Sequence, residues 1–262
     1  NQATPAIDLW RAFKLSPMAI ALIIVALLTA TLSGTTGVGG GTILIATLYA
    51  FGMTPAMAVP LHAVIQLTSN GTRALAYLRH ITLKPLGWFM LTALPAPFLV
   101  APIIATADAN YLRIITAVFV ALSLIPGVLS GLKLTGRRGL ALAGLIAGGA
   151  GTVLAAVGTM IGPLFLAQKQ WQKESVIANL AFCQCVTHAV KVLAYGLEGF
   201  NPFANWQLLL PLLLAVIVGT WLGKHLNGKL PDIWFNRLTT AVLAILAVNL
   251  FYDGVSGIVT AA

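Results

Sequence analysis

The stretch Gly37-Val-Gly-Gly-Gly41 interrupts an apolar sequence of membrane-spanning length. A glycine inside a helix is about 1 kcal/mol less favourable than alanine, so several glycines together are expected to end one helix and start another. The apolar segment that follows, at 42–52, is too short to cross a bilayer, which takes about 20 helical residues. The sequence therefore predicts a broken helix at membrane depth, and such breaks are tolerated only where protein or water lines them.

The composition of the whole chain predicts an all-α polytopic membrane protein. Of its 262 residues, 59% are hydrophobic and only 8% are charged, whereas roughly a quarter are charged in soluble domains. A soluble enzyme is therefore excluded. Stretches such as Met18–Leu28 and Leu208–Val218 are apolar on every face, which argues against the in-and-out alternation of a membrane β-barrel.

The apolar runs divide the chain into about 8–10 helical segments. We expect these segments at approximately 17–34, 42–52, 57–79, 85–106, 110–130, 139–157, 163–169, 173–196, 204–224 and 233–252. The preceding residues, 1–16, are expected to form an interfacial segment, since Ile7–Leu15 mixes apolar with charged positions. A frayed tail is the alternative for these residues.

Polar residues inside two of these segments repeat along the chain. At one constant offset, Gln66, Asn70, Arg73 and Tyr77 fall on Gln184, His188, Lys191 and Tyr195. With a shorter loop, Gly37–Thr42 falls on Gly158-Thr-Met-Ile-Gly162-Pro163, where Pro163 is expected to start a second short helix directly after Gly162. A matched polar set in apolar surroundings indicates duplication. We expect two membrane repeats, 17–132 and 133–262, each with a Gly-broken helix pair.

An odd number of segments in each half predicts that the two halves enter the membrane from opposite sides, as an inverted-topology repeat. The net charge of +9 agrees with this arrangement, because most of the cations fall in short loops, where they are topology signals rather than a nucleic-acid site. The loop cations that we expect on the cytoplasmic side are Arg79, Lys84, Lys133, Arg137, Arg138, Lys169, Lys173, Lys224 and Lys229. Asp108, Glu198 and Asp253 then lie outside, in loops or at segment ends.

The repeated polar residues form a stripe on each of two helices. At about 100° per residue, Gln66, Asn70 and Arg73 share one face of their helix, which His62 joins, and their counterparts share the equivalent face. Ionisable groups in membrane segments usually face a cavity or a partner. Snorkelling toward the surface is the alternative for the two cations. Because no membrane-embedded carboxylate is placed to pair with them, we expect an anionic substrate as their counter-ion.

The Gly-rich breaks fit the same interpretation. A half-helix that begins there directs unpaired N–H groups and a positive dipole end at the cavity, although close helix packing through small residues is an alternative. We expect leucine at Gly39 or Gly40 to block the approach of substrate to these N–H groups. The candidate substrate-binding residues are Gly37, Gly39, Gly40, Gly41, Gln66, Asn70, Arg73, Gly158, Gly162, Gln184, His188 and Lys191.

With these motifs, the chain resembles the sulfite exporter TauE/SafE family, also called TSUP. The resemblance rests on the two breaks, at Gly37–Gly41 and Gly158–Pro163, and on the polar-striped segment after each, and it covers nearly the whole chain. The second break departs from the family's pattern, with Thr159, Met160 and Ile161 where more glycine is expected. The resemblance implies a multi-pass transporter of the bacterial inner membrane, a secondary carrier of sulfite, sulfonates or related sulfur anions.

Other functions compete with a secondary carrier that works by alternating access. The runner-up is a passive anion channel, and a third is an intramembrane redox enzyme that uses Cys183 and Cys185. An enzyme is disfavoured, because no cofactor motif accompanies the cysteines and no nucleophile–base pair is evident. We expect no cofactor, no metal and no partner beyond the anion and the bilayer, with the oligomeric state open. His188 is either a proton carrier or a simple hydrogen-bonding residue.

Overall fold

The structure is a computed structural model that describes residues 16–37, 39–125, 134–155, 157–227 and 232–261. Every regular element in these ranges is helical. Residues 1–15, for which we expected an interfacial segment, lie outside them. Five helical stretches are long and apolar enough to cross a membrane: Pro17–Thr35, Leu83–Ile104, Lys173–Leu197, Trp206–Leu226 and Leu243–Thr260. The chain is thus an all-helical, multi-pass membrane protein.

The first half holds a long helix, a short helix and a polar-striped helix, followed by three further segments. Its elements are α2 (Pro17–Thr36), α3 (Gly40–Ala50), α4 (Pro55–Ala76), the 3-10 turn η1 (Leu78–His80), α5 (Leu83–Ala93), α6 (Ala96–Thr106) and α7 (Ala109–Leu124). Pro17 and Pro55 each occupy the first helical position, where the missing N–H costs nothing. The expected segment 85–106 is divided into α5 and α6 beside Pro95, which disrupts the helical hydrogen bonds.

The second half follows the same order. Its elements are α8 (Gly136–Leu145), the π-helical turn η3 (Ile146–Ala150), α9 (Gly151–Leu154), α10 (Gly158–Leu166), α11 (Lys173–Leu197), the 3-10 turn η4 (Pro202–Asn205), α12 (Trp206–Leu226) and α13 (Asp232–Ala261). In place of the helix expected at 139–157, α8, η3 and α9 follow one another without a gap and form one helix with a single π-helical turn in it. Such local widenings of a helix often occur at functional sites.

Two expectations for this half were wrong. The short helix begins at Gly158 rather than at Pro163, which lies inside α10. The helix starts earlier because Ala155, with φ 59°, ends α9 and allows α10 to begin three residues later. Pro163 then lies inside α10, where it lacks the N–H that would donate a helical hydrogen bond. Asp253 lies within α13, not at a segment end, because apolar residues continue the helix to Ala261. Its side chain is exposed.

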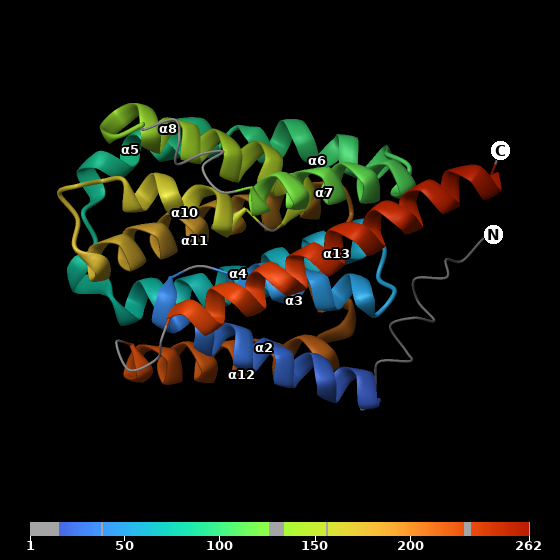
Figure 1. Ribbon diagram of the computed structural model, residues 1–262, viewed down its shortest axis with the longest axis horizontal. Helices are drawn as coiled ribbons and strands as arrows, with labels where there is room; N and C mark the ends of the chain where they lie inside the picture. Colours follow the sequence, from blue (N-terminus) through green and yellow to red (C-terminus); the bar gives the residue numbers. More distant parts are fainter. Residues whose placement is uncertain (1–15, 38, 126–133, 156, 228–231, 262) are drawn as a thin grey trace.

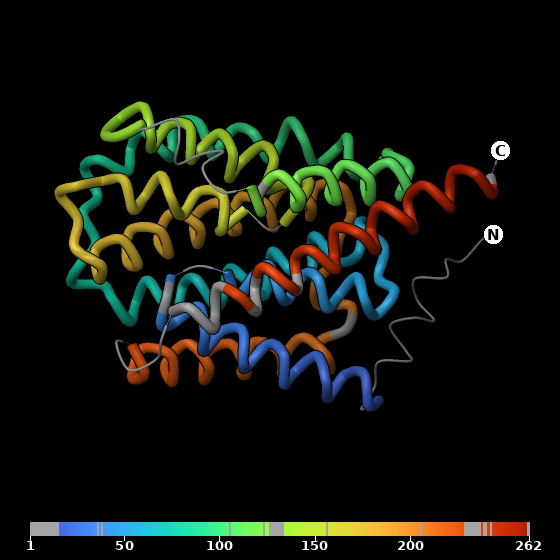
Figure 2. The backbone as a smooth tube through the Cα atoms, viewed as in Figure 1, coloured from blue at the N-terminus to red at the C-terminus, as the bar shows by residue number. Residues whose placement is uncertain are grey.

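Four helix pairs have the most extensive contacts, and Figures 1 and 2 show how they are arranged. Helices α2 and α12 run parallel and approach closely where Gly34 meets Gly223. Helices α5 and α8 likewise run parallel, with Gly144 against the backbone of Phe89. The other two pairs, α4 with α11 and α7 with α13, are antiparallel. Small residues at these contacts let the backbones approach, which is how helices associate within lipid.

Several features of the first half recur 118 positions later in the second, which is also the separation of Gln66 from Gln184. Gly37, with φ 81°, ends α2, and Ala155, with φ 59°, ends α9. At the same offset α3 begins at Gly40 and α10 at Gly158. The sequence had suggested matching Gly37–Thr42 with Gly158–Pro163, because the second short helix was expected to start at Pro163. With the helix starting at Gly158, the counterpart of Gly158 is Gly40.

The same hydrogen bond recurs at this offset. The Tyr77 hydroxyl donates to the carbonyl oxygen of Gly34 at 3.2 Å, and the Tyr195 hydroxyl donates to that of Thr152. We expect Tyr77→Phe and Tyr195→Phe each to lower the free energy of unfolding by about 1–3 kcal/mol, because each leaves a buried carbonyl without its partner. Thermal unfolding of both variants in detergent measures this. Tyr111→Phe, at an exposed position, is the control, and parental stability in both buried variants would contradict the expectation.

The described loop cations gather at one end of the molecule. Figure 1 places there the η1 turn, the starts of α5, α8 and α11, and the end of α12. These segments, together with the loop between α10 and α11, carry Arg79, Lys84, Arg137, Arg138, Lys169, Lys173 and Lys224. Asp108, before α7, and Glu198, after α11, lie at the opposite end. Lys133 and Lys229 fall outside the described residues.

Candidate functional site

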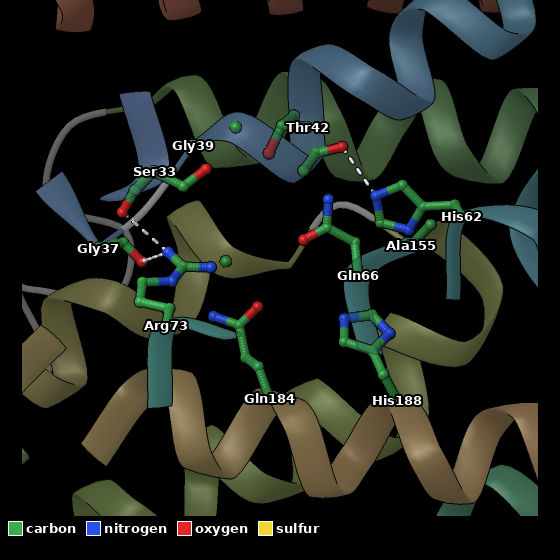
Figure 3. A pocket seen from close by; sticks show the side chains of 13 residues that line it. Ser33, Gly37, Gly39, Thr42, His62, Gln66, Arg73, Ala155, Gln184 and His188 are labelled. Atoms are coloured by element: carbon green, nitrogen blue, oxygen red, sulfur yellow. Dashed lines mark hydrogen bonds between the residues drawn. The ribbon is translucent and has the colours of Figure 1, made fainter. Parts of the chain in front are cut away.

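A small polar cavity lies where the two short helices begin, between the polar stripes of α4 and α11 (Figure 3). Its volume is about 20 Å³, room for about one water molecule. It is lined by Ser33, Gly37, Gly39, Gly40, Gly41, Thr42, His62, Gln66, Arg73, Ala155, Gly158, Gln184 and His188. No aspartate or glutamate is among these lining residues. Both halves of the chain contribute to it.

The starts of α3 and α10 supply backbone donors to the cavity. The carbonyl of Gly39 accepts from Thr42 and Ile43, which leaves the N–H groups of Gly40 and Gly41 without a partner inside α3. In the second half the carbonyl of Val157 accepts from Met160 and Ile161, so that Gly158 and Thr159 are left in the same way. Two helix N-termini, each carrying a partial positive charge, thus converge on one small space.

Arg73 carries a full positive charge into this space. Its side chain is 3% exposed, so it does not snorkel toward the surface. One terminal nitrogen, Nη1, donates to the carbonyl oxygens of Ser33 at 3.0 Å and Gly37 at 2.9 Å, where α2 ends. The Ser33 carbonyl also accepts the N–H of Gly37 at 2.8 Å, and Gly37 itself lies directly after the last helical residue of α2. Arg73 therefore stabilises the broken helix, while its Nε, buried and without a partner, remains available to a ligand.

A chain of amide hydrogen bonds positions Arg73. Asn70 Oδ1 accepts from Arg73 Nη2 at 2.5 Å, and Asn70 Nδ2 donates to Gln66 Oε1 at 3.3 Å and to the Gln66 carbonyl at 2.9 Å. In the second half, Gln184 and His188 lie along α11 and point toward the cavity (Figure 3). A polar arrangement of this kind offers donors at several angles, which suits an oxyanion with several oxygens.

Most of the residues expected in the site line this cavity, but three do not. Asn70 is fully buried and acts through Arg73 and Gln66. Gly162 lies inside α10, and Lys191 lies beside Gly151, with its Nζ 2.8 Å from where a Cβ on that glycine would be. Four lining residues were not among the expected ones: Ser33, Thr42, His62 and Ala155. Of these, His62 shares the stripe of α4 and Thr42 ends the repeated break motif Gly37–Thr42, whereas Ser33 and Ala155 had no signal in the sequence.

The glycines of the first break serve two different purposes. A Cβ on Gly40 would overlap with Ser33 Oγ and the carbonyl oxygen of Thr29, whereas a Cβ on Gly41 would meet the Gln66 amide, the nearest atom at 3.0 Å. Gly40 is thus required for packing against α2, and Gly41 leaves room for a flexible side chain at the cavity. This corrects our reason for the effect of leucine at Gly40, which we had attributed to obstruction of the substrate.

Comparison with known proteins agrees with the resemblance noted above. The family described as sulfite exporter TauE/SafE matches residues 22–250, which include both short helices and both polar stripes. The chain belongs to the TauE/SafE family. Members of this family are transporters of sulfur-containing anions rather than enzymes. Neither a curated protein nor a solved structure matches this TauE/SafE chain.

Membership of the TauE/SafE family changes the weight of the alternatives. A redox role for the cysteines is removed, and both are free thiols in α11, Cys183 buried and Cys185 partly exposed. Within the described ranges, no group of three or more histidine, cysteine, aspartate or glutamate side chains is arranged to hold a metal ion.

Proposed function

We propose that this TauE/SafE protein is a secondary carrier that binds a small sulfur oxyanion, such as sulfite or a sulfonate, in the cavity between α3 and α10. The observation that carries the proposal is the buried guanidinium of Arg73. Its Nε has no hydrogen-bond partner, its side chain lines the cavity at which α3 and α10 begin, and no carboxylate lines that cavity. A buried cation without an acidic partner is costly, and a bound anion would supply the missing charge.

Alternating access of two inverted repeats is the mechanism that we propose. It is supported by the constant offset of 118 positions and by the directions of the helices. Helix α4 is antiparallel to its counterpart α11, and α7 to its counterpart α13. The other two large contacts are equivalent to each other: α2 of the first half packs on α12 of the second, and α8 of the second half packs on α5 of the first. Rocking of one repeat against the other around a central site is how inverted-repeat carriers work.

The size of the cavity is consistent with a closed state of such a carrier. About 20 Å³ accepts one water but not an anion of four heavy atoms, so binding requires side chains to move. Gln66 and Gln184 are suited to this, because they point into the cavity (Figure 3) and their amides are flexible. We place the cation-rich end in the cytoplasm, following the positive-inside rule, in a bacterial inner membrane.

Counterflow in proteoliposomes tests the proposal. Vesicles loaded with unlabelled sulfite are expected to accumulate labelled sulfite transiently, because a carrier exchanges bound anions across the membrane. A panel of sulfate, thiosulfate, methanesulfonate and acetate establishes which anions compete. Protein-free vesicles are the control. Flux without counterflow would indicate a passive channel, and absence of any sulfite flux would contradict the proposed function.

A further inference from the structure

His62 is a buried titratable side chain that anion binding alone does not explain. It lies within α4 and is 1% exposed. Its Nε2 is 2.8 Å from the carbonyl oxygen of Gly41. Because a carbonyl oxygen only accepts, Nε2 must carry the hydrogen, and in the neutral imidazole Nδ1 then has a lone pair and no hydrogen. That Nδ1 is buried and has no partner, although its ring lines the cavity.

A second imidazole faces it from the other half of the chain. The rings of His62 and His188 lie edge to face, with centroids 5.9 Å apart, and Nδ1 of His188 also has no partner. Figure 3 shows both rings at the same side of the cavity, away from Arg73. The site thus combines a cation at one side with a pair of proton acceptors at the other.

The other charged groups near His62 are mostly positive. Lys191 of α11 acts electrostatically on both histidines, and Arg73 acts on His188. On the remaining elements packed against α4, the titratable groups lie elsewhere: Tyr49 of α3 beside Arg113 of α7, Lys224 of α12 at Ala76, His225 at the exposed end of α12, and Glu198 after α11 near Pro60. A proton on His62 therefore meets repulsion from Lys191, which an anion in the cavity would offset.

We propose that each anion crosses this site together with one proton, held on Nδ1 of His62. This rests on the proposed function and adds the coupling ion to it. A bare Nδ1 lone pair repels the oxygens of an anion, whereas a protonated Nδ1 donates a hydrogen bond to one of them. The proton arrives from water on the side where the anion enters. When the anion leaves, repulsion from Lys191 is no longer offset, and the proton departs to water on the side of release.

The experiment measures protons and anions together in proteoliposomes. The probes are sulfate, thiosulfate and methanesulfonate, which have no titratable proton near neutral pH. Any proton that moves with them is therefore carried by the protein and not by the anion. For whichever probe exchanges, we expect uptake of about one proton per anion, read from a trapped pH-sensitive dye, and accumulation driven by an acidic exterior. Probe uptake without proton movement would overturn the inference and leave the proposed function intact.

A matched pair of variants assigns the proton to His62. His62→Gln keeps a side-chain N–H that can donate to Gly41 but removes the titratable nitrogen. We expect it to exchange the probe more slowly, because one donor to the anion is lost, and we expect the exchange that remains to proceed without proton movement and without accumulation driven by the pH gradient. His80→Gln, in the exposed η1 turn, is expected to behave as the parent. Parental gradient-driven accumulation in His62→Gln would overturn the assignment.

Two further outcomes are decisive. If His62→Gln does not fold, the proton-to-anion ratio of the parent still decides the matter, since a ratio near zero overturns the inference. Exchange of sulfite but of none of the three probes would also overturn the inference. If His62 carries the proton, the anion does not need a titratable proton of its own to be transported. If no anion of any kind exchanges, the proposed function fails and the coupling fails with it.

Discussion

Arg73→Gln is expected to abolish anion exchange and to destabilise the empty protein. The guanidinium bonds two carbonyl oxygens at the end of α2 and the Asn70 amide, and glutamine cannot reach all three. Loss of these charge-assisted bonds costs about 2–4 kcal/mol, partly offset because a buried charge is removed. Exchange should fall by about 100-fold or more, equivalent to roughly 2.7 kcal/mol of lost binding. Thermal melting with and without sulfite, together with counterflow, measures both effects.

Lys191→Gln is the matched comparison, because Lys191 is the counterpart of Arg73 in the second half. Its ammonium lies beside Gly151, and among the described residues it does not hold a pair of helix-end carbonyls as Arg73 does. We expect the empty variant to melt near the parent but to show a smaller stabilisation by sulfite, since stabilisation by a ligand follows its affinity. An unchanged sulfite effect in both variants would exclude the two cations from binding.

Gly40→Ala is expected to prevent accumulation of folded protein, although alanine normally favours a helix by about 1 kcal/mol over glycine. The added methyl group would overlap with the backbone carbonyl of Thr29 and with Ser33 Oγ, and a backbone atom cannot rotate away. Overpacking of this kind costs about 1–3 kcal/mol or more, and here it separates α3 from α2. The yield of monodisperse protein after detergent extraction is the measurement.

Gly158→Ala is the control for that substitution, because Gly158 starts α10 as Gly40 starts α3. Its added methyl group would lie 3.6 Å from Gln184 Nε2, an ordinary contact with a flexible side chain. We therefore expect Gly158→Ala to be extracted in parental yield. Equal losses in the two variants would show that glycine is required for the backbone at both helix starts rather than for packing at one of them.

The first break could be predicted from sequence because glycine is the residue that adopts left-handed conformations at no cost. Gly37 and Gly39 both have positive φ, as the motif indicates. The second break could not be placed correctly, because it depends on Ala155 in a conformation that alanine rarely adopts. Without a glycine at that position, Pro163 was the stronger local signal, and the helix start was placed too late.

The composition of the cavity was predictable only in part. Helical periodicity shows which side chains share a face, and it correctly grouped His62 with Gln66 and Arg73. It does not show depth or the direction of a long side chain, which is why Lys191 was expected in a cavity that it does not line. The contributions of Ser33 and Gly37 come through backbone carbonyls, which no side-chain pattern reports.

The one-sided placement of loop cations corresponds to positions at which the two halves of the chain differ in charge. At the offset of 118 positions, each described loop cation has a neutral counterpart. The pairs are Arg79 with Leu197, Lys84 with Pro202, Arg137 with Ala19, Arg138 with Ile20, Lys169 with Phe51, Lys173 with Pro55 and Lys224 with Thr106. Buried Arg73, by contrast, is matched by another cation, Lys191. The two halves thus share a positive charge in the core but differ in charge at their loops, and it is this difference between the loops that can set the orientation of the chain in the membrane.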